Sequence, residues 1–280
     1  MAEWARGTPW RQGALLPRDA TDALGFGLPQ EDPAGTAVVV VSHDCDLVQP
    51  PDVEPKVEVI SGRRIAGPDG NYTHGKNPRR LHLPLDGDAA AGWVELEATR
   101  KRDVEKRDLA SYQPDATCFL TAGAKSILQR WLAARYRRAA FPDEFNDRLH
   151  RTGLAERLTR IMSKGGALIS AVLFDLDNGE EIVRTDADDP YGLEIYLLYG
   201  TRADPDAAAA AAEGVKGQIE QAFRRACYDA GRGRWRQIEL VDCLPVSDQA
   251  LTVAQSEMLK RWHADYISLR ADPAQEILND

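Results

Sequence analysis

An unbroken run of β-branched residues constrains the fold of this chain more than any other sequence feature. Residues 38–41 are four adjacent valines, and a serine, Ser42, follows them. A run of this kind without charge is typical of a buried β-strand. Four side chains able to titrate or bind metal come next, and we expect the strand end to aim them at one point, which makes them the first candidate site: His43, Asp44, Cys45 and Asp46.

The chemistry of this motif depends on its backbone. In an extended backbone His43 and Cys45 would share one face, where they could ligate zinc or act as base and nucleophile. Asp44 and Asp46 would share the other face, as hydrogen-bonding carboxylates or ligands of a hard metal. A loop would instead let all four converge. In the structural alternative Cys45 is a small buried hydrophobe and an aspartate caps a turn before Pro50.

No ligand pair of recognised zinc spacing accompanies the motif, so metal and cofactor stay unassigned. The four cysteines are scattered, and none forms a Cys-x-x-Cys pair, which favours reduced thiols. The longest uncharged apolar stretch, residues 37–41, is far shorter than the roughly 20 residues of a membrane span. The N-terminus lacks a basic region followed by an apolar one. We therefore expect a cytoplasmic protein with no membrane partner.

The charge is unevenly distributed. A formal net charge of −9 argues against a general nucleic-acid coat, because Lys and Arg dominate phosphate binding. Two segments, residues 63–80 and 100–107, are nevertheless rich in arginine and lysine. If they meet in space they form a local basic patch; otherwise they are two solvated loop edges.

The spacing of apolar residues predicts an α+β fold in 280 residues, enough for two modest domains. Residues 1–122 should form a small β-barrel, because short strand-like segments alternate with Pro- and Gly-rich turns. The expected strands are residues 13–16, 37–42, 56–61, 80–83, 93–98 and 116–120. Residues 67–76 should be an exposed connection, open to proteolysis.

Helical periodicity begins after the predicted barrel. Residues 123–165 read as a helical linker, with one helix over 125–138 and another from Pro142 to about Met162. Residues 166–280 read as an α+β domain. Its expected elements are a hairpin of residues 167–176 and 192–199, a helix over 205–230, a strand over 237–244 and a closing helix over 251–263.

Three segments of the first part, residues 34–42, 57–61 and 102–109, resemble in order and spacing the PemK/MazF-like toxins, small SH3-like barrels that cleave RNA. The first is similar to the family's valine-rich second strand. The next is similar to a strand ending in a catalytic threonine, which Ser61 would replace. The third is similar to a later strand with an arginine, an acid–lysine pair and a leucine. The resemblance covers the N-terminal part only.

One departure from the family pattern affects the expected chemistry. The family's catalytic arginine and the proline after it correspond here to Thr36 and Ala37. The cation that would stabilise the developing charge of the phosphorane is therefore missing from its place. Such a barrel would have kept the binding groove of the toxin family but replaced its catalytic residues.

The first functional hypothesis is a nucleic-acid-acting, toxin-like protein, with an endoribonuclease as its most specific form. His43 would supply an acid or a base, and Ser61 or the cluster of residues 43–46 would lie near the reacting centre. Four cations would hold phosphates, two of them beside the backbone-fixing Pro78: Arg79, Arg80, Arg102 and Lys106.

Two other functions remain open. A non-catalytic binding or regulatory module would use a degenerate barrel to recognise RNA, DNA or a protein, while its C-terminal unit mediates assembly, for example as a homodimer. A cysteine- or metal-dependent enzyme on an unknown substrate is the third. The acidic balance and the missing arginine favour the binding module, whereas residues 43–46 favour an enzyme.

Overall fold

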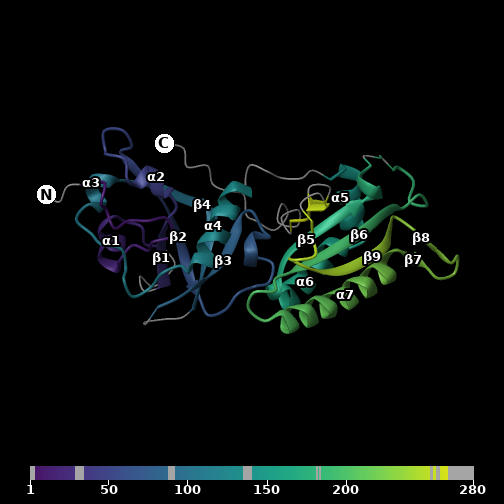
Figure 1. The fold of residues 1–280 in the computed structure, drawn as a ribbon. Coiled ribbons are helices and arrows are strands. Elements are labelled where there is room, and N and C mark those ends of the chain that lie inside the picture. Colours follow the sequence, from purple (N-terminus) through teal and green to yellow (C-terminus); the bar gives the residue numbers. More distant parts are fainter. Residues whose placement is uncertain are drawn as a thin grey trace. The chain divides into compact units, whose positions relative to one another are not determined.

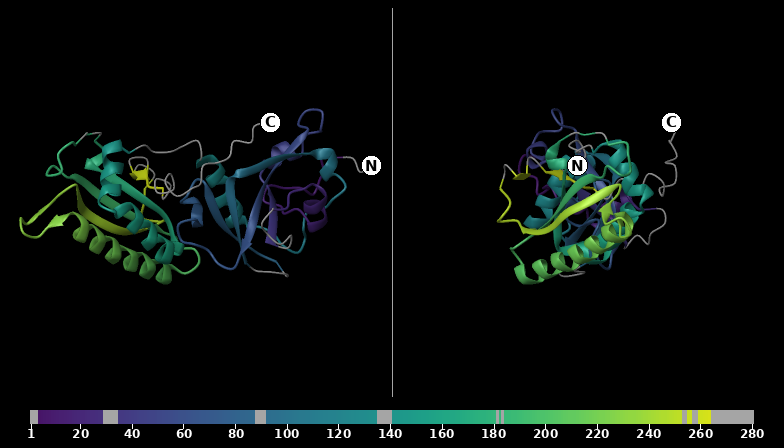
Figure 2. Two further views of the ribbon diagram at one scale, coloured as in Figure 1. Left: turned by 180° about the vertical axis from the view of Figure 1, so that it is seen from behind. Right: turned by 90° about the vertical axis from the view of Figure 1, so that its right-hand side faces the viewer.

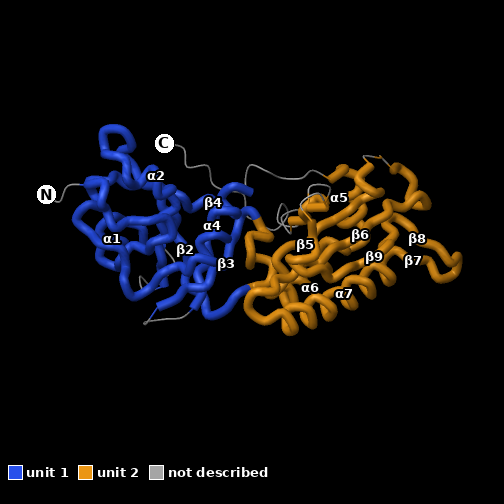
Figure 3. The backbone as a smooth tube through the Cα atoms, viewed as in Figure 1, with its two compact units in different colours: residues 1–68, 78–136 blue, residues 69–77, 137–280 orange. Residues whose placement is uncertain are grey.

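The computed structural model describes residues 4–28, 35–87, 92–134, 141–180, 182, 184–252, 255–256 and 259–263. The chain divides into two compact units (Figure 3). Unit 1 comprises Met1–Pro68 and Pro78–Tyr136, and unit 2 comprises Asp69–Asn77 and Arg137–Asp280. Both contain helices and a sheet, so the fold is α+β, as predicted. Within the described part of the chain, no helix is long and apolar enough to cross a membrane.

Unit 1 is built on a four-stranded antiparallel sheet in the order β1-β2-β4-β3 (Figure 1). Its strands are β1 (Thr36–Val40), β2 (Lys56–Ile65), β3 (Arg80–Leu85) and β4 (Gly92–Glu105). The segment before β1 continues the pairing, because the amides of Gly13 and Leu16 donate to the carbonyls of Val40 and Val38. Most of the strands predicted for residues 1–122 are therefore found paired with a neighbouring segment.

The valine run is buried because both faces of β1 are covered. Val39 packs in a cluster that includes Trp131 of α4 (Ala122–Ala134). Val38 and Val40 point to the opposite face, into a cluster with Trp10 and other N-terminal residues. The short helices α1 (Arg18–Ala23) and α3 (Lys106–Leu109) contribute to this second cluster. A strand buried on both faces does not need polar residues at alternate positions.

The sheet is not shown to close into a barrel. Its end strands are β1 and β3, and pairing beyond them consists of short contacts. Asp86 forms an isolated bridge with Phe119, and the amide of Asp115 donates to the carbonyl of Leu15. A register shift between Ile60 and Gly62 bends β2 against β4, as expected of a β-bulge. The described residues therefore establish a bent sheet with two ends.

Unit 2 contains a mixed sheet in the order β10-β5-β6-β9. The predicted hairpin is confirmed, since β5 (Ile169–Leu176) pairs antiparallel with β6 (Tyr191–Tyr199). Next to it, β9 (Ile238–Ser247) runs parallel to β6, after the crossover helix α7 (Pro205–Cys227). Helix α7 and the shorter α6 (Leu154–Gly165) lie along the sheet (Figure 2), and both share its main apolar cluster with α5 (Asp143–Arg151).

Residues 69–77 belong to unit 2 although they lie between two strands of unit 1 in the sequence. Lys76 is buried, and its Nζ lies 2.5 Å from the carbonyl oxygens of both Gly166 and Ile169. Gly70 approaches α6 so closely that an added Cβ would lie 2.1 Å from the carbonyl oxygen of Met162. This segment is packed, so it is a poorer target for proteolysis than the sequence indicated.

Two helical predictions need correction. A closing helix over residues 251–263 is wrong at its end, where the strand β10 (Lys260–Arg261) pairs with β5. The neighbouring Trp262 stacks on Phe174 of β5 with ring centroids 5.7 Å apart, which favours the sheet edge over a helix. The expected linker, residues 123–165, is divided between the cores: α4 packs in unit 1, whereas α5 and α6 pack in unit 2.

Candidate functional site

The motif after the valine run forms a short helix, α2 (Asp44–Leu47). His43 is its N-cap, and its Nδ1 accepts a hydrogen bond of 3.2 Å from the amide of Cys45. The carboxylate of Asp44 accepts from the amide of Gln12 at 2.7 Å. The motif is exposed from His43 to Asp46, so Cys45 is not the buried hydrophobe of the structural alternative. The motif is thus neither the extended backbone nor the loop considered above, and no group of three metal-ligating side chains is found among the described residues.

Ser61 and Arg102 are brought together by the segment before β1. Ser61 is 4% exposed, and its hydroxyl donates to the carbonyl of Phe26 at 3.3 Å. Arg102 is exposed, donates to the carbonyl of Gly25 at 2.9 Å and lies 4.8 Å from the centroid of the Phe26 ring. The two predicted site residues therefore share one neighbour, but the serine hydroxyl is covered.

Lys106 is fully buried at the start of α3. Its Nζ donates to the carbonyls of Asp46 and Gln49, at 2.6 and 2.9 Å. Burial lowers the pKa of this amine, although the carboxylates of Glu54 and Asp46 oppose the shift. The ammonium group of Lys106 holds the end of α2 in place. Because its donors are engaged there, we do not propose Lys106 as a phosphate-binding residue.

The two basic segments meet in part, since Arg63 and Arg80 of the first and Arg100 of the second gather around two carboxylates of β4. Glu95 on the inner strand β4 lies opposite Arg63 on β2 and His82 on β3. Its Oε1 is 2.9 Å from Arg63 Nη2, and its Oε2 is 2.9 Å from His82 Nε2. Arg80 Nε lies 3.7 Å from the same Oε2. One carboxylate thus gathers three basic side chains from both neighbouring strands.

A second carboxylate extends this group. Glu97, two residues further along β4, accepts from Arg80 at 3.4 Å and from Arg100 at 2.8 Å. We call the whole set the Glu95 cluster: Arg63, Arg80, His82, Glu95, Glu97 and Arg100. The predicted Arg79 precedes Arg80, is half-buried, and accepts through its carbonyl from the amide of Ala98.

The inner and outer members of the Glu95 cluster differ in exposure. The side chains of His82 and Glu95 are 5% and 9% exposed, whereas those of Arg63, Arg80 and Arg100 are 47%, 36% and 42% exposed. The hydrogen bond with His82 and the charges of Arg80 and Arg63 lower the pKa of Glu95 to about 2, against the effect of burial. The carboxylate of Glu95 is therefore fixed and ionised, and the arginine side chains around it are partly exposed to solvent.

Sequence reasoning found part of this cluster. Arg63, Arg80 and Arg100 were in the two basic segments, and Arg80 was a phosphate-binding candidate. Glu95 and Glu97 were missed. Polar residues alternate along β4, and this pattern could have indicated that Glu95 and Glu97 share one face of the sheet. The basic side chains that they contact depend on the register between strands, which the sequence alone does not give.

Comparisons with protein families, with curated proteins and with solved structures found no match for this chain. The likeness to PemK/MazF toxins therefore stays a matter of sequence pattern, and the function has to be inferred from the residues themselves.

Proposed function

We propose that the chain is a nucleic-acid-binding protein whose unit 1 contacts phosphates through the Glu95 cluster. One observation carries the proposal: three arginines with exposed guanidinium groups converge on two carboxylates on one face of a sheet. Among the described residues of the cluster, arginines outnumber carboxylates, in a chain with a net charge of −9. Guanidinium groups bind phosphate through paired N–H donors, which suits them to this role.

RNA is the first ligand to test. The toxin-like order of segments in residues 34–109 supports this choice, and so does the bent antiparallel sheet, which we propose to be a degenerate SH3-like barrel with a changed groove. Cytoplasmic location belongs to the same proposal, since it is where an RNA-binding role would be exercised.

Binding is better supported than cleavage by the Glu95 cluster. A general base works best with a pKa near the operating pH, and the pKa of Glu95 is about 2. His82 is buried and engaged with Glu95, and the Ser61 hydroxyl is covered by the carbonyl of Phe26. None of these three groups is placed to exchange protons with a bound phosphodiester.

An endoribonuclease is the second candidate, and the exposure of His43 and Cys45 favours it. Because the Nδ1 of His43 accepts a hydrogen bond, the imidazole would exchange a proton through Nε2. If His43→Gln abolishes cleavage of single-stranded RNA by an otherwise active protein, the catalytic function replaces the binding one. If wild-type protein leaves bound RNA intact, the binding function stands.

The binding proposal predicts the effect of removing two guanidinium groups. Arg63→Gln with Arg80→Gln should weaken binding of a labelled single-stranded RNA at least about tenfold in low salt, because two phosphate contacts are lost. Fluorescence anisotropy measures the affinity. Arg6→Gln with Arg130→Gln is the control, with the same charge change at two exposed positions of unit 1.

Folding has to be kept separate from binding in this experiment. The single variant Arg100→Gln disturbs only a surface pair with Glu97 and should weaken binding about threefold without a change in thermal unfolding. Equal affinities for the Glu95-cluster variants and the control pair would contradict the proposal.

A further inference from the structure

A small hairpin of unit 2 carries a second group of arginines, which the sequence reasoning did not single out. Strands β7 (Tyr228–Asp229) and β8 (Arg234–Trp235) pair antiparallel directly after α7 (Figure 1). The segment from Gly231 to Arg236 reads Gly-Arg-Gly-Arg-Trp-Arg. Arg232 lies in the turn, Arg234 begins β8, and Arg236 follows the strand directly.

The turn of the hairpin is fixed by its own hydrogen bonds. The carboxylate of Asp229 accepts from the amides of Gly231 and Arg232, at 3.0 and 3.1 Å. The carbonyl of Asp229 accepts from the amide of Gly233, which has a φ of +66° that favours glycine. The hairpin is therefore an ordered support for the side chains it carries.

Its three arginines converge on one carboxylate. Arg234 Nη2 and Arg236 Nε lie 2.5 and 2.7 Å from the oxygens of Asp188, and Arg232 Nη1 lies at 3.9 Å. Their side chains remain 58%, 46% and 44% exposed for Arg232, Arg234 and Arg236. The three guanidinium groups lower the pKa of Asp188, with the hydrogen bond from Arg236 as the main cause.

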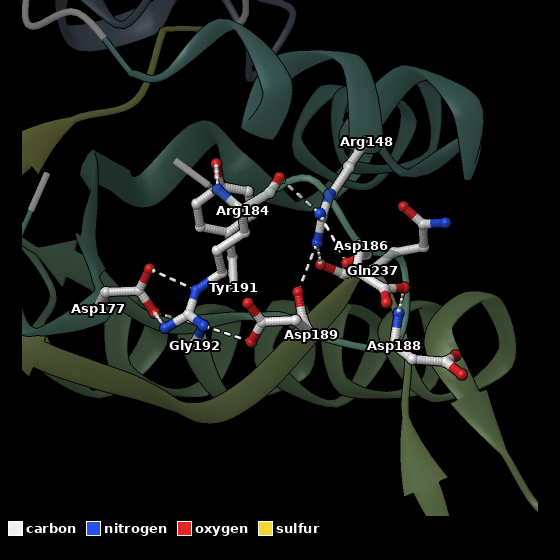
Figure 4. A network of polar contacts seen from close by, with 9 residues as sticks. All are labelled: Arg148, Asp177, Arg184, Asp186, Asp188, Asp189, Tyr191, Gly192 and Gln237. Atoms are coloured by element: carbon white, nitrogen blue, oxygen red, sulfur yellow. Dashed lines mark hydrogen bonds and ion pairs between the residues drawn. The ribbon is translucent and has the colours of Figure 1, made fainter. Parts of the chain in front are cut away.

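Asp188 lies in a loop that is fixed from inside the unit. Arg148 is fully buried and donates to the carbonyls of Arg184, Asp186, Asp189 and Gln237 (Figure 4). The carboxylate of Asp186 accepts from the amide of Asp188 at 2.9 Å. The backbone that carries Asp188 is thus held in place independently of the three arginines.

Positive charge exceeds negative charge around the hairpin. Arg224 and Arg225, exposed at the end of α7, add to the three hairpin arginines, and Arg224 lies 5.2 Å from the centroid of the Tyr228 ring. Among the described residues, five arginines of the hairpin and the end of α7 thus accompany three carboxylates, those of Asp186, Asp188 and Asp229. The described residues leave an excess of positive charge here, which attracts an anion.

We infer that the β7–β8 hairpin is a second phosphate-contacting surface, for single-stranded nucleic acid; this inference rests on the proposed function. Aromatic rings lie among the arginines, since Tyr228 and Trp235 contact each other with centroids 5.3 Å apart. Arginine combined with aromatic rings suits single strands, whose phosphates and unstacked bases are both accessible. An acidic peptide would interact with the arginine charges but would have no bases to stack on the aromatic rings.

The test compares salt dependence in the full chain. Replacing Arg232, Arg234 and Arg236 together by Gln should weaken binding of a labelled single-stranded RNA at least about tenfold. The slope of log K against log salt should fall by about 2, at roughly 0.7 per lost phosphate contact. The Arg→Lys version of the triple variant keeps the charge and should keep most of the affinity. The control triple lies on α4, on α6 and before α7: Arg130, Arg160 and Arg202, each replaced by Gln.

The opposite change should strengthen binding. Asp188→Asn releases the three guanidinium groups and should tighten RNA binding about threefold, whereas Glu213→Gln, an equal charge change in the middle of α7, should not. Unchanged affinity in both the triple Gln variant and Asp188→Asn would overturn the inference while the effect of Arg63 and Arg80 still supports the proposed function.

Two further outcomes are informative. If the triple Gln variant loses binding of labelled polyglutamate but keeps the RNA affinity of the wild type, the hairpin binds acidic peptide, and the nucleic-acid inference is wrong. If the wild type binds no nucleic acid at low salt, the proposed function and this inference fall together.

Discussion

Glu95 shows how one buried carboxylate can organise basic residues from the two strands beside it. His82 and Arg63 reach it at 2.9 Å, and Arg80 at 3.7 Å. Its cost of burial is offset because these partners keep it ionised. At the scale of single residues, the site is an ion-pair centre with outward-facing donors.

This arrangement predicts a loss of stability in acid. The folded pKa of Glu95 is about 2, below its ordinary value of 4.5, so its stabilisation is present above pH 4.5 and lost as the pH falls toward 2. Glu95→Gln should lower the free energy of unfolding of unit 1 by about 2–3 kcal/mol at pH 6 and by much less at pH 2.5. Urea unfolding measures both; the exposed Glu58→Gln is the control. If Glu95→Gln lowered the free energy of unfolding equally at pH 6 and pH 2.5, the ion-pair account would be contradicted.

Lys76 has the opposite pH signature. Burial, and then the charge of Arg261, lower its pKa from 10.5 to about 7, while Asp69 acts in the other direction. Below pH 7 the amine is charged in both the folded and unfolded states. Between pH 7 and 10.5 only the unfolded state holds the proton, so stability rises with pH in that window.

A variant without the amine should lack this dependence. Relative to Lys76→Met, wild-type unit 2 should gain about 2 kcal/mol of unfolding free energy between pH 7 and pH 9, at roughly 1.4 kcal/mol per pH unit as an upper limit. Lys164→Met on α6 serves as the comparison for a lysine in ordinary surroundings. Parallel pH profiles for wild type and Lys76→Met would show that the amine does not titrate in this range.

At the scale of elements, Arg148 joins α5 to the loop before β6 and to the start of β9. Besides its four carbonyl acceptors, its Nε donates to Glu144 at 3.0 Å, and its guanidinium lies 4.9 Å from the centroid of the Tyr191 ring. Arg184 fixes the same loop through both carboxylate oxygens of Asp177. The carbonyl groups of this loop therefore accept hydrogen bonds from the side chain of Arg148, where those of a strand would accept from a neighbouring strand.

Arg148→Met should destabilise unit 2 by at least about 3 kcal/mol, because buried carbonyls would lose their donors. Arg151→Met removes an exposed partner of the same Glu144 and should cost less than about 1 kcal/mol. Urea unfolding distinguishes the two. Equal costs would mean that the carbonyl contacts of Arg148 contribute little.

Elements were more predictable than their contacts. The valine run, the β5–β6 hairpin and α7 were visible in the sequence because apolar spacing and alanine content are local signals. Residues 69–77 looked like an open loop, since their packing against α6 and β5 depends on residues about 90 positions away. The Glu95 cluster was hidden for the same reason, because strand register is a property of pairs.

At the scale of the whole molecule, the net charge of −9 conceals two separate basic surfaces. The Glu95 cluster lies in unit 1, and the β7–β8 hairpin lies in unit 2. Each unit has its own apolar core. Two phosphate-contacting surfaces on one chain would raise the overall affinity for a long strand above that of either surface alone.

The most direct measurement is the affinity of the wild-type 280-residue chain for a labelled single-stranded RNA over a range of salt concentrations, with the RNA recovered afterwards on a denaturing gel. The account predicts binding at low salt, an affinity that falls steeply as salt rises, and intact RNA at the end. Absence of binding at low salt would contradict it, and shortened RNA would show that the protein is a nuclease.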